Sequence, residues 1–170
     1  MAIKGKMYID GYSKNFSLVE CEYNFNQTVD SDGLPNDGIS GGQVIATIVT
    51  PSKGVFLYEW MLHNWMFHNG YIEFVTNVNS SHPSYHIIMF EDAKCVDLFE
   101  YFNNQNHVMM TTRLTLQCGK IGFYNENDGG IAYDFRRKKV VELSAGQWLT
   151  SADRDPGAPF IPYLEKSGIL

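Results

Sequence analysis

The clearest hydrophobic pattern in the chain is an alternation of apolar and polar residues that follows Phe16. One face of this segment is apolar and consists of Val19, Cys21, Tyr23 and Phe25. The opposite face is polar and consists of Glu20, Glu22, Asn24 and Asn26. A period of two residues is typical of a β-strand with one buried face, so the pattern predicts a half-buried strand here.

A longer period follows between Pro51 and Gly70, where large apolar residues recur every three or four positions. These residues are Phe56, Leu57, Trp60, Met61 and Trp65. The spacing predicts one amphipathic helix, with Ser52 as its N-cap and Gly70 as its stop.

Further segments have the β-branched and aromatic content of strands, and they cover residues 43–50, 71–78, 85–90, 94–102 and 109–123. The first of them is apolar on both faces, so we expect one face to pack in a core and the other to meet a neighbour. In the last of them one face is formed by Met110, Thr112, Leu114, Leu116 and Cys118. The pattern therefore predicts a mainly β fold, a small antiparallel barrel or sandwich plugged at one end or side by the single helix.

Residues 30–42 interrupt the strands with Asp, Ser, Gly, Pro and Asn, and only Leu34 and Ile39 among them are large and apolar. This composition predicts an exposed loop. Loops of this length are uncommon in compact domains and tend to be functional.

The composition and the pattern of the chain change again after about Asn125. A hairpin is predicted over residues 131–143 with its turn at residues 136–139, and a Pro- and Gly-rich stretch covers residues 153–162. We therefore expect a β-barrel domain over residues 1–124 and a C-terminal extension over residues 125–170.

The charge balance of the 170 residues excludes some partners, because 13 Lys and Arg against 19 Asp and Glu give a net charge of −6. Nucleic acid is not expected as a partner of such a chain. The first ten residues lack the apolar run of a signal peptide, and no stretch approaches the roughly 20 apolar residues of a membrane span. We expect a cytoplasmic protein without membrane insertion, whose three cysteines stay reduced.

Few residues of the sequence stand in patterns that are typical of catalysis or metal binding. His63 and His68 lie on different faces of the predicted helix, and the glycines near Gly42 precede a strand rather than a helix. Glu20 and Glu22 lie roughly 7 Å apart on one strand face, a separation that the paired carboxylates of a glycosidase can use. A small β-sandwich hydrolase or binding module is thus one interpretation, but we expect no catalytic residue, cofactor or metal ion.

Spaced sequence blocks resemble a known family when they are taken in order. The blocks are Cys21 to Asp30, Gly33-Leu34-Pro35, Gly41-Gly42, Phe56 to Met61, Gly70 to Phe74, Phe90 to Val96 and Met110 to Cys118. Together they resemble the Hcp (TssD) tube proteins of type VI secretion, in the branch found in Bacteroidetes-type bacteria, over roughly residues 3 to 123. The chain departs from that branch at Leu34, where a basic residue is usual, and at Lys94, where an aromatic residue is usual.

The resemblance implies a β-barrel with one helix that assembles into hexameric rings, which stack head to tail into a tube inside a contractile sheath. It implies the sheath, the spike and effector proteins in the lumen as partners, and secretion through the machine without a signal peptide. The same barrel builds the tail tubes of phages and other contractile injection systems, which is the alternative within this class.

Two sets of residues follow as candidates for assembly. In the exposed loop, Asp32, Leu34, Pro35 and Asp37 are expected to contact an adjacent subunit. On the strand faces, Glu20, Glu22, Arg113 and Gln117 are expected to face the lumen. For the extension the sequence leaves open a lid over the lumen, a docking element for the spike or an effector, and a fused fragment with its own binding role.

Overall fold

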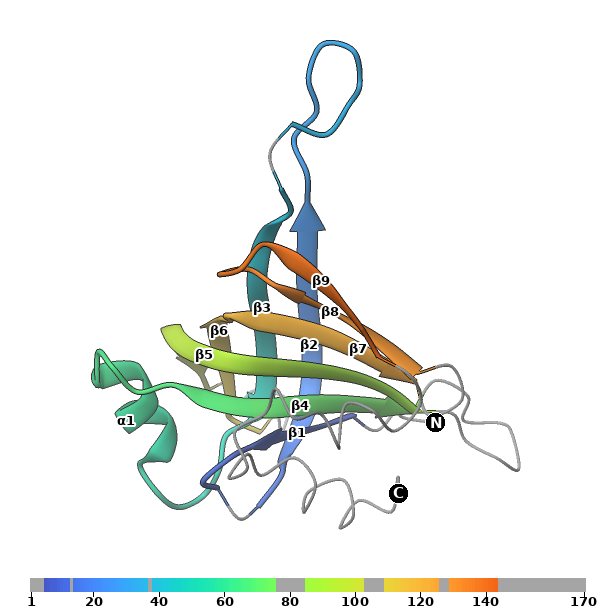
Figure 1. Cartoon of the computed structure of the whole chain (residues 1–170). Coiled ribbons are helices and arrows are strands. Elements are labelled where there is room, and N and C mark those ends of the chain that lie inside the picture. The colour runs from blue at the N-terminus through green and yellow to red at the C-terminus, as the bar shows by residue number, and fades with distance from the viewer. Residues whose placement is uncertain are drawn as a thin grey trace.

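The computed structural model describes residues 5–12, 14–36, 38–75, 85–102, 109–125 and 129–143. These residues form one short helix and a set of antiparallel strands (Figure 1). The elements are β1 (Gly5–Ile9), β2 (Phe16–Asn26), β3 (Ser40–Val49), α1 (Phe56–Leu62), β4 (His68–Val75), β5 (Tyr85–Tyr101), β6 (Thr111–Gln117), β7 (Lys120–Asn125), β8 (Gly129–Asp134) and β9 (Lys139–Leu143). Within the described ranges, no helix is long and apolar enough to cross a bilayer.

Six of the strands close into an antiparallel barrel. Their hydrogen-bonded order is β4-β1-β2-β3-β6-β5, and β5 pairs back onto β4. Closure removes the free edges that an open sheet would expose. The predicted mainly β fold with a small barrel is confirmed.

The barrel core consists of the inward-facing residues that alternate along these strands. Met7, Ile9, Val44, Ala46, Ile48, Ile72, Ile88, Phe90, Leu114 and Leu116 are each fully buried. The helix adds Leu57 and Trp60 to the same cluster, and the Trp60 indole Nε1 donates a hydrogen bond to the carbonyl of Ala93 at 3.0 Å. α1 therefore closes the core beside the strands rather than standing apart from them.

The helix is shorter than the sequence predicts. It starts after Val55 without a side-chain cap, so Ser52 is not its N-cap, and it ends at Leu62. Gly70 does not stop a helix but lies in β4, paired with Ile9 of β1 and Phe90 of β5. A Cβ at this position would lie 2.2 Å from the Tyr8 carbonyl oxygen, so the close approach of β1 explains the glycine.

Strand boundaries differ from the prediction along β5 to β7. The two predicted strands over residues 85–90 and 94–102 form one strand, β5, with an irregularity between Cys95 and Asp97. The single strand predicted over 109–123 is divided after Gln117 into β6 and β7, although both pair along β5. The partner strands on the side away from β5 explain the division, because β6 pairs with β3 whereas β7 pairs with β8.

The predicted hairpin is present as β8 and β9, with its turn between Asp134 and Lys139. β8 pairs with β7, so the hairpin continues the sheet beyond the closed barrel. The division of the chain near residue 125 into barrel and extension stays a prediction. The Pro- and Gly-rich stretch over 153–162 lies outside the described residues.

The half-buried strand over Phe16–Asn26 is β2, with one difference in its apolar face. A register shift between Leu18 and Glu20 changes the alternation, so Leu18 rather than Val19 packs against the core with Cys21. Val19 is instead 58% exposed. A bulge of this kind adds one residue to a strand and cannot be seen in a strict period of two.

Candidate assembly surfaces

The outer face of β2, β3, β6 and β5 is a continuous surface whose rows follow from strand register. In one row Glu20 pairs with Thr47, Thr47 with Arg113, and Arg113 with Phe99. Paired residues of antiparallel strands point to the same side of the sheet. Glu20 and Arg113, which lie on β2 and β6, therefore belong to one face, which we call the four-strand face.

The neighbouring rows place the other predicted lumen residues on the same face. Glu22 pairs with Ile45, which pairs with Thr115. Gln117 pairs with Gln43, and its Nε2 donates a hydrogen bond to the Gly41 carbonyl at 3.2 Å. The structure thus brings Glu20, Glu22, Arg113 and Gln117 onto one surface, and whether that surface lines a channel stays a prediction.

Both signs of charge are present on the four-strand face. The Arg113 guanidinium carbon lies 5.1 Å from the centroid of the Phe99 ring, a cation–π contact of about 0.5–1 kcal/mol at an exposed site. The carboxylates of Glu20 and Glu22 lie on the neighbouring strand and are exposed. A shallow cavity beside them is lined by Glu22, Tyr23, Asn24, Gln43 and Ile45.

The loop between β2 and β3 is braced by its own hydrogen bonds. The Asp30 carboxylate accepts hydrogen bonds from the backbone N–H groups of Asp32 and Leu34, both at 2.9 Å. Gly33, with φ of 79°, donates its N–H to the Asp30 carbonyl at 3.1 Å, and an isolated bridge joins Val29 to Pro35. The loop tip, residues 29–35, is therefore an ordered turn.

Figure 1 shows this loop projecting beyond the ends of β2 and β3, away from the barrel. Of the predicted contact residues, Asp32, Leu34 and Pro35 lie in the loop tip, and Leu34 is 63% exposed. Asp37 lies outside the described residues. Sequence reasoning missed the role of Asp30, although an Asp three residues before a Gly is a recognisable turn signal.

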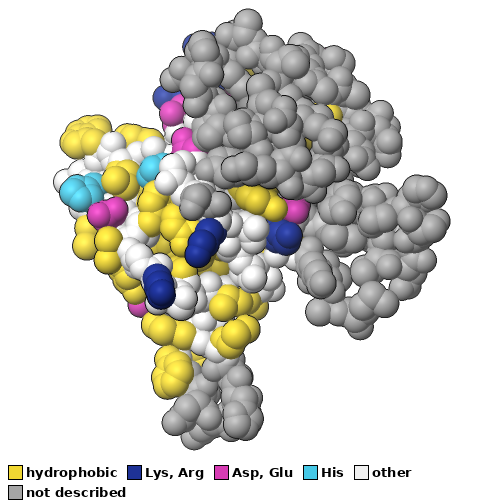
Figure 2. Space-filling view, turned by 90° about the horizontal axis from the view of Figure 1, so that it is seen from below, with side chains coloured by type: hydrophobic (Ala, Val, Ile, Leu, Met, Phe, Trp, Pro, Cys, Tyr) yellow, Lys and Arg dark blue, Asp and Glu magenta, His cyan; other side chains and the backbone are white. Residues whose placement is uncertain are grey.

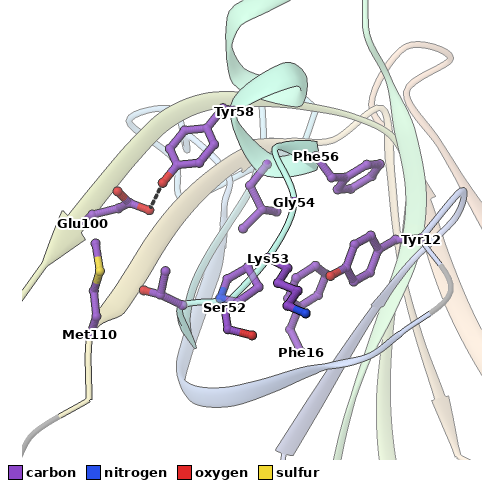
Figure 3. Close-up of a pocket in the computed structure, with 12 residues that line it drawn as sticks. Tyr12, Phe16, Ser52, Lys53, Gly54, Phe56, Tyr58, Glu100 and Met110 are labelled. Atoms are coloured by element: carbon purple, nitrogen blue, oxygen red, sulfur yellow. Dashed lines mark hydrogen bonds between the residues drawn. The ribbon is translucent and has the colours of Figure 1, made fainter.

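A pocket lies at the other end of β2 and β3, between the barrel and α1 (Figure 3). It has a volume of about 290 Å³. Its lining comes from Tyr12, Phe16, Thr50, Pro51, Ser52, Lys53, Gly54, Phe56, Leu57, Tyr58, Glu100 and Met110. Sequence reasoning did not find this pocket, because its walls come from segments that are far apart in the chain.

Aromatic side chains form much of the pocket wall. The Tyr12 ring stacks on Phe16 with centroids 4.7 Å apart and is tilted against Phe56 at 5.2 Å. On the far wall the Tyr58 hydroxyl donates a 2.7 Å hydrogen bond to the Glu100 carboxylate, which raises the pKa of Tyr58. Lys53 is the lining residue that carries a positive charge.

Lys94 of β5 holds α1 against the barrel. Its ammonium Nζ donates hydrogen bonds to the carbonyl oxygens of Trp60 at 2.6 Å, Met61 at 3.2 Å and Cys95 at 3.1 Å. α1 has no basic residue in its own last turn, so Lys94 supplies the positive charge that a helix C-terminus favours. The departure from the family branch at this position thus has a role within the subunit.

His63, His68 and the three cysteines lie within the described residues. His63 is exposed, whereas His68 Nδ1 lies 2.9 Å from Asp10 Oδ1 and its ring packs against Trp60. Within the described part of the chain, no three His, Cys, Asp or Glu residues are grouped to hold a metal ion. The cysteines are free thiols, and burial raises the pKa of Cys21 to about 12 and that of Cys95 to about 11.

A buried acid lies on the outer side of β1 and β4. Glu73 is 7% exposed, and its Oε1 accepts a 3.5 Å hydrogen bond from the Tyr8 hydroxyl. Burial raises the pKa of the Glu73 carboxyl, and the nearby Lys6 only partly opposes this. Burial and the Glu73 charge together raise the pKa of Tyr8 to about 12.

Solved structures have the same fold. Hcp1 from Flavobacterium johnsoniae superposes with a TM-score of 0.63 at 21% identity, covering 77% of this chain and 98% of its own. Hcp1 from Salmonella typhimurium gives a TM-score of 0.65 at 13% identity, covering 83% of this chain and 100% of its own. No curated protein sequence matches this chain.

The family model for hemolysin coregulated protein Hcp (TssD) matches residues 1–128. That range includes the barrel strands β1 to β6, the loop, α1 and β7, and it ends just before the β8–β9 hairpin begins at Gly129. The sequence resemblance to this family is thus confirmed, and the likeness to the Flavobacterium protein fits the Bacteroidetes-type branch. The chain belongs to the Hcp (TssD) family, the structural tube proteins of type VI secretion.

Proposed function

We propose that this chain is the subunit of the inner tube of a type VI secretion machine, in which hexameric rings stack head to tail and carry effectors. The observation that supports this most is that the two ends of the barrel differ. A braced loop projects from one end, and a pocket with aromatic walls lies at the other (Figures 1 and 3). A subunit with different surfaces at its two ends is suited to a heterologous, repeating assembly.

The four-strand face is the proposed wall of the lumen, with Glu20, Glu22, Arg113 and Gln117 pointing into it. Its central rows contain charges of both signs and the hydroxyls of Thr47 and Thr115, together with the half-exposed ring of Phe99, so water can wet much of the surface. The margins of this face differ from its centre, because Val19, Val96, Tyr101, Phe102 and Met109 are exposed apolar residues. We assign these margins to contacts between neighbouring subunits of one ring.

In this proposal the loop residues Asp32, Leu34, Pro35 and Asp37 contact a subunit of the next ring. The tube has the sheath and the spike as further partners and holds effectors in its lumen, and the subunit itself performs no catalysis. It is made in the cytoplasm and leaves the cell through the machine. The match to the Hcp family model favours this function over a phage tail tube and over a hydrolase.

Electron cryomicroscopy of the purified assembly tests these assignments. We expect ring-shaped particles in which Glu20, Glu22, Arg113 and Gln117 line the central channel. Finding these four side chains in the contact between subunits, or on the outside of the ring, would refute the lumen assignment. Deleting Leu34 and Pro35 should leave the rings intact and shorten the tubes, and tubes of unchanged length would refute the role of the loop.

A further inference from the structure

We infer that the pocket between α1 and the barrel is the receptor for the loop tip of a subunit in the next ring, with Leu34 inserted and Asp32 paired with Lys53. This inference rests on the proposed function and adds the partner surface. The occupant is a second copy of this chain.

Position favours a contact between copies over one within a copy. The pocket contains Phe16, the first residue of β2, whereas the loop follows Asn26, the last residue of the same strand. β2 has 11 residues, so the two features lie roughly 35 Å apart at a rise of about 3.3 Å per residue. A loop cannot reach the pocket of its own subunit, but it meets the pocket of the next subunit when copies stack end to end.

The apolar parts of the two surfaces are complementary. Leu34 is 63% exposed at the loop tip, so most of its side chain is available to a partner. The pocket offers the stacked rings of Tyr12 and Phe16 and the edge of Phe56. A volume of about 290 Å³ equals roughly ten water molecules at about 30 Å³ each, which is enough for an aliphatic side chain and part of its neighbour.

The described part of the end that contains the pocket exposes many apolar side chains. Figure 2 views the molecule from below, opposite the projecting loop, and shows apolar side chains gathered over the described part of that end with Lys and Arg among them. An apolar surface with a few charges at its rim is typical of a protein interface. This supports a macromolecular occupant rather than a small polar ligand.

The two surfaces also offer one pair of opposite charges. Asp30 and Asp32 give the loop tip a negative charge, and Asp30 is already occupied by the backbone N–H groups of the turn. The pocket contains one cation, the exposed Lys53, and one carboxylate, Glu100, which accepts hydrogen bonds from Tyr58 and Thr112. Asp32 is therefore the exposed carboxylate left to pair with Lys53. Such a pair fixes register and orientation more than it adds affinity.

The loop tip is preorganised for insertion. The hydrogen bonds to Asp30 and the bridge between Val29 and Pro35 hold Leu34 in one place before any partner arrives. Ordering a loop on binding costs free energy, so a loop that is already ordered binds more tightly.

Disulfide trapping tests the contact directly. The double variant Leu34→Cys with Ser52→Cys places one thiol on the loop tip and one on the pocket, and disulfides form only between Cα atoms within about 7 Å. After oxidation we expect a ladder of covalent multimers on a non-reducing gel. The matched control is Leu34→Cys with Val140→Cys, where Val140 is 52% exposed on β9 and lies outside the pocket.

A charge swap provides a second test that does not depend on cysteine chemistry. Lys53→Glu and Asp32→Lys should each shorten stacks of rings, and the double variant should restore their length. If each contact weakens about twofold, association of two hexameric rings weakens roughly sixtyfold, because the contacts act together. Lys139→Glu, at an exposed lysine of β9, is the control with the same change of charge.

The outcomes separate this inference from the function on which it rests. Rings that form normally but give no ladder above the control, or stacks that Lys53→Glu leaves unchanged, would overturn the pocket assignment and leave the tube subunit standing. Absence of rings from the parent chain would overturn the proposed function itself.

Discussion

Lys94 gives the most specific prediction about stability, because its ammonium group joins the C-terminal end of α1 to β5. In Lys94→Met the aliphatic stem remains and the ammonium group is removed. The carbonyls of Trp60 and Met61 then lose their charged donor, which lies 2.6 and 3.2 Å away in the parent. The Cys95 carbonyl loses a third hydrogen bond of 3.1 Å.

The size of the effect follows from the kind of hydrogen bond. Hydrogen bonds to a charged group contribute about 1.5–3 kcal/mol, and the set shares a single ammonium group. Because Lys94 is only partly buried, water can reach part of the site after the substitution. We therefore expect the free energy of unfolding to fall by about 2 kcal/mol, and Tm to fall by about 4–8 °C for a chain of this size.

Urea unfolding of the parent and of Lys94→Met, followed by circular dichroism, measures this difference. Lys139→Met is the matched control, because Lys139 is exposed on β9, and its free energy of unfolding should stay within about 0.5 kcal/mol of the parent. If Lys94→Met differed from the parent no more than this control does, Lys94 would not hold α1 in place.

Three further predictions concern single sites. Gly70→Ala brings a Cβ to 2.2 Å from the Tyr8 carbonyl oxygen, so the free energy of unfolding measured by thermal unfolding should fall by about 1–3 kcal/mol or more. A Tm equal to that of the parent would refute the close packing of β1 against β4. Because burial raises the pKa of the Cys21 thiol to about 12, a disulfide reagent at about pH 8 should label it far more slowly in the folded protein than in urea; equal rates would contradict this. Burial also raises the pKa of the Glu73 carboxyl above its ordinary value of 4.5, so the stability that its protonated form contributes is present at low pH and is lost as pH rises through the folded-state pKa. Glu73→Gln should therefore gain stability relative to the parent as pH is raised above about 4.5, and a difference in urea unfolding that stays constant with pH would argue against it.

The strands could be predicted from the sequence because their signal is local. Alternation in β2 and the apolar face of β6 each identify a strand within a few residues. The helix was located correctly but its end was not, since Gly70 is explained by the approach of β1 from far away in the sequence. The division between β6 and β7 is likewise set by a change of partner strand, which no local pattern contains.

For the candidate surfaces, too, the local features could be predicted from the sequence and the features that depend on the fold could not. Asp32, Leu34 and Pro35 could be chosen from composition alone, because a turn-rich loop is a local feature. That Glu20 and Arg113 share a face depends on the register of β2, β3 and β6, which only the fold determines. The pocket and the contacts of Lys94 were missed for the same reason, since their partners come from distant segments.

The central claim is that this chain assembles into rings, and the most direct test is the mass of the purified protein in solution by native mass spectrometry. The account predicts a dominant species with the mass of a hexamer of the 19.4 kDa chain. A stable monomer over the concentrations at which the protein is purified would contradict it.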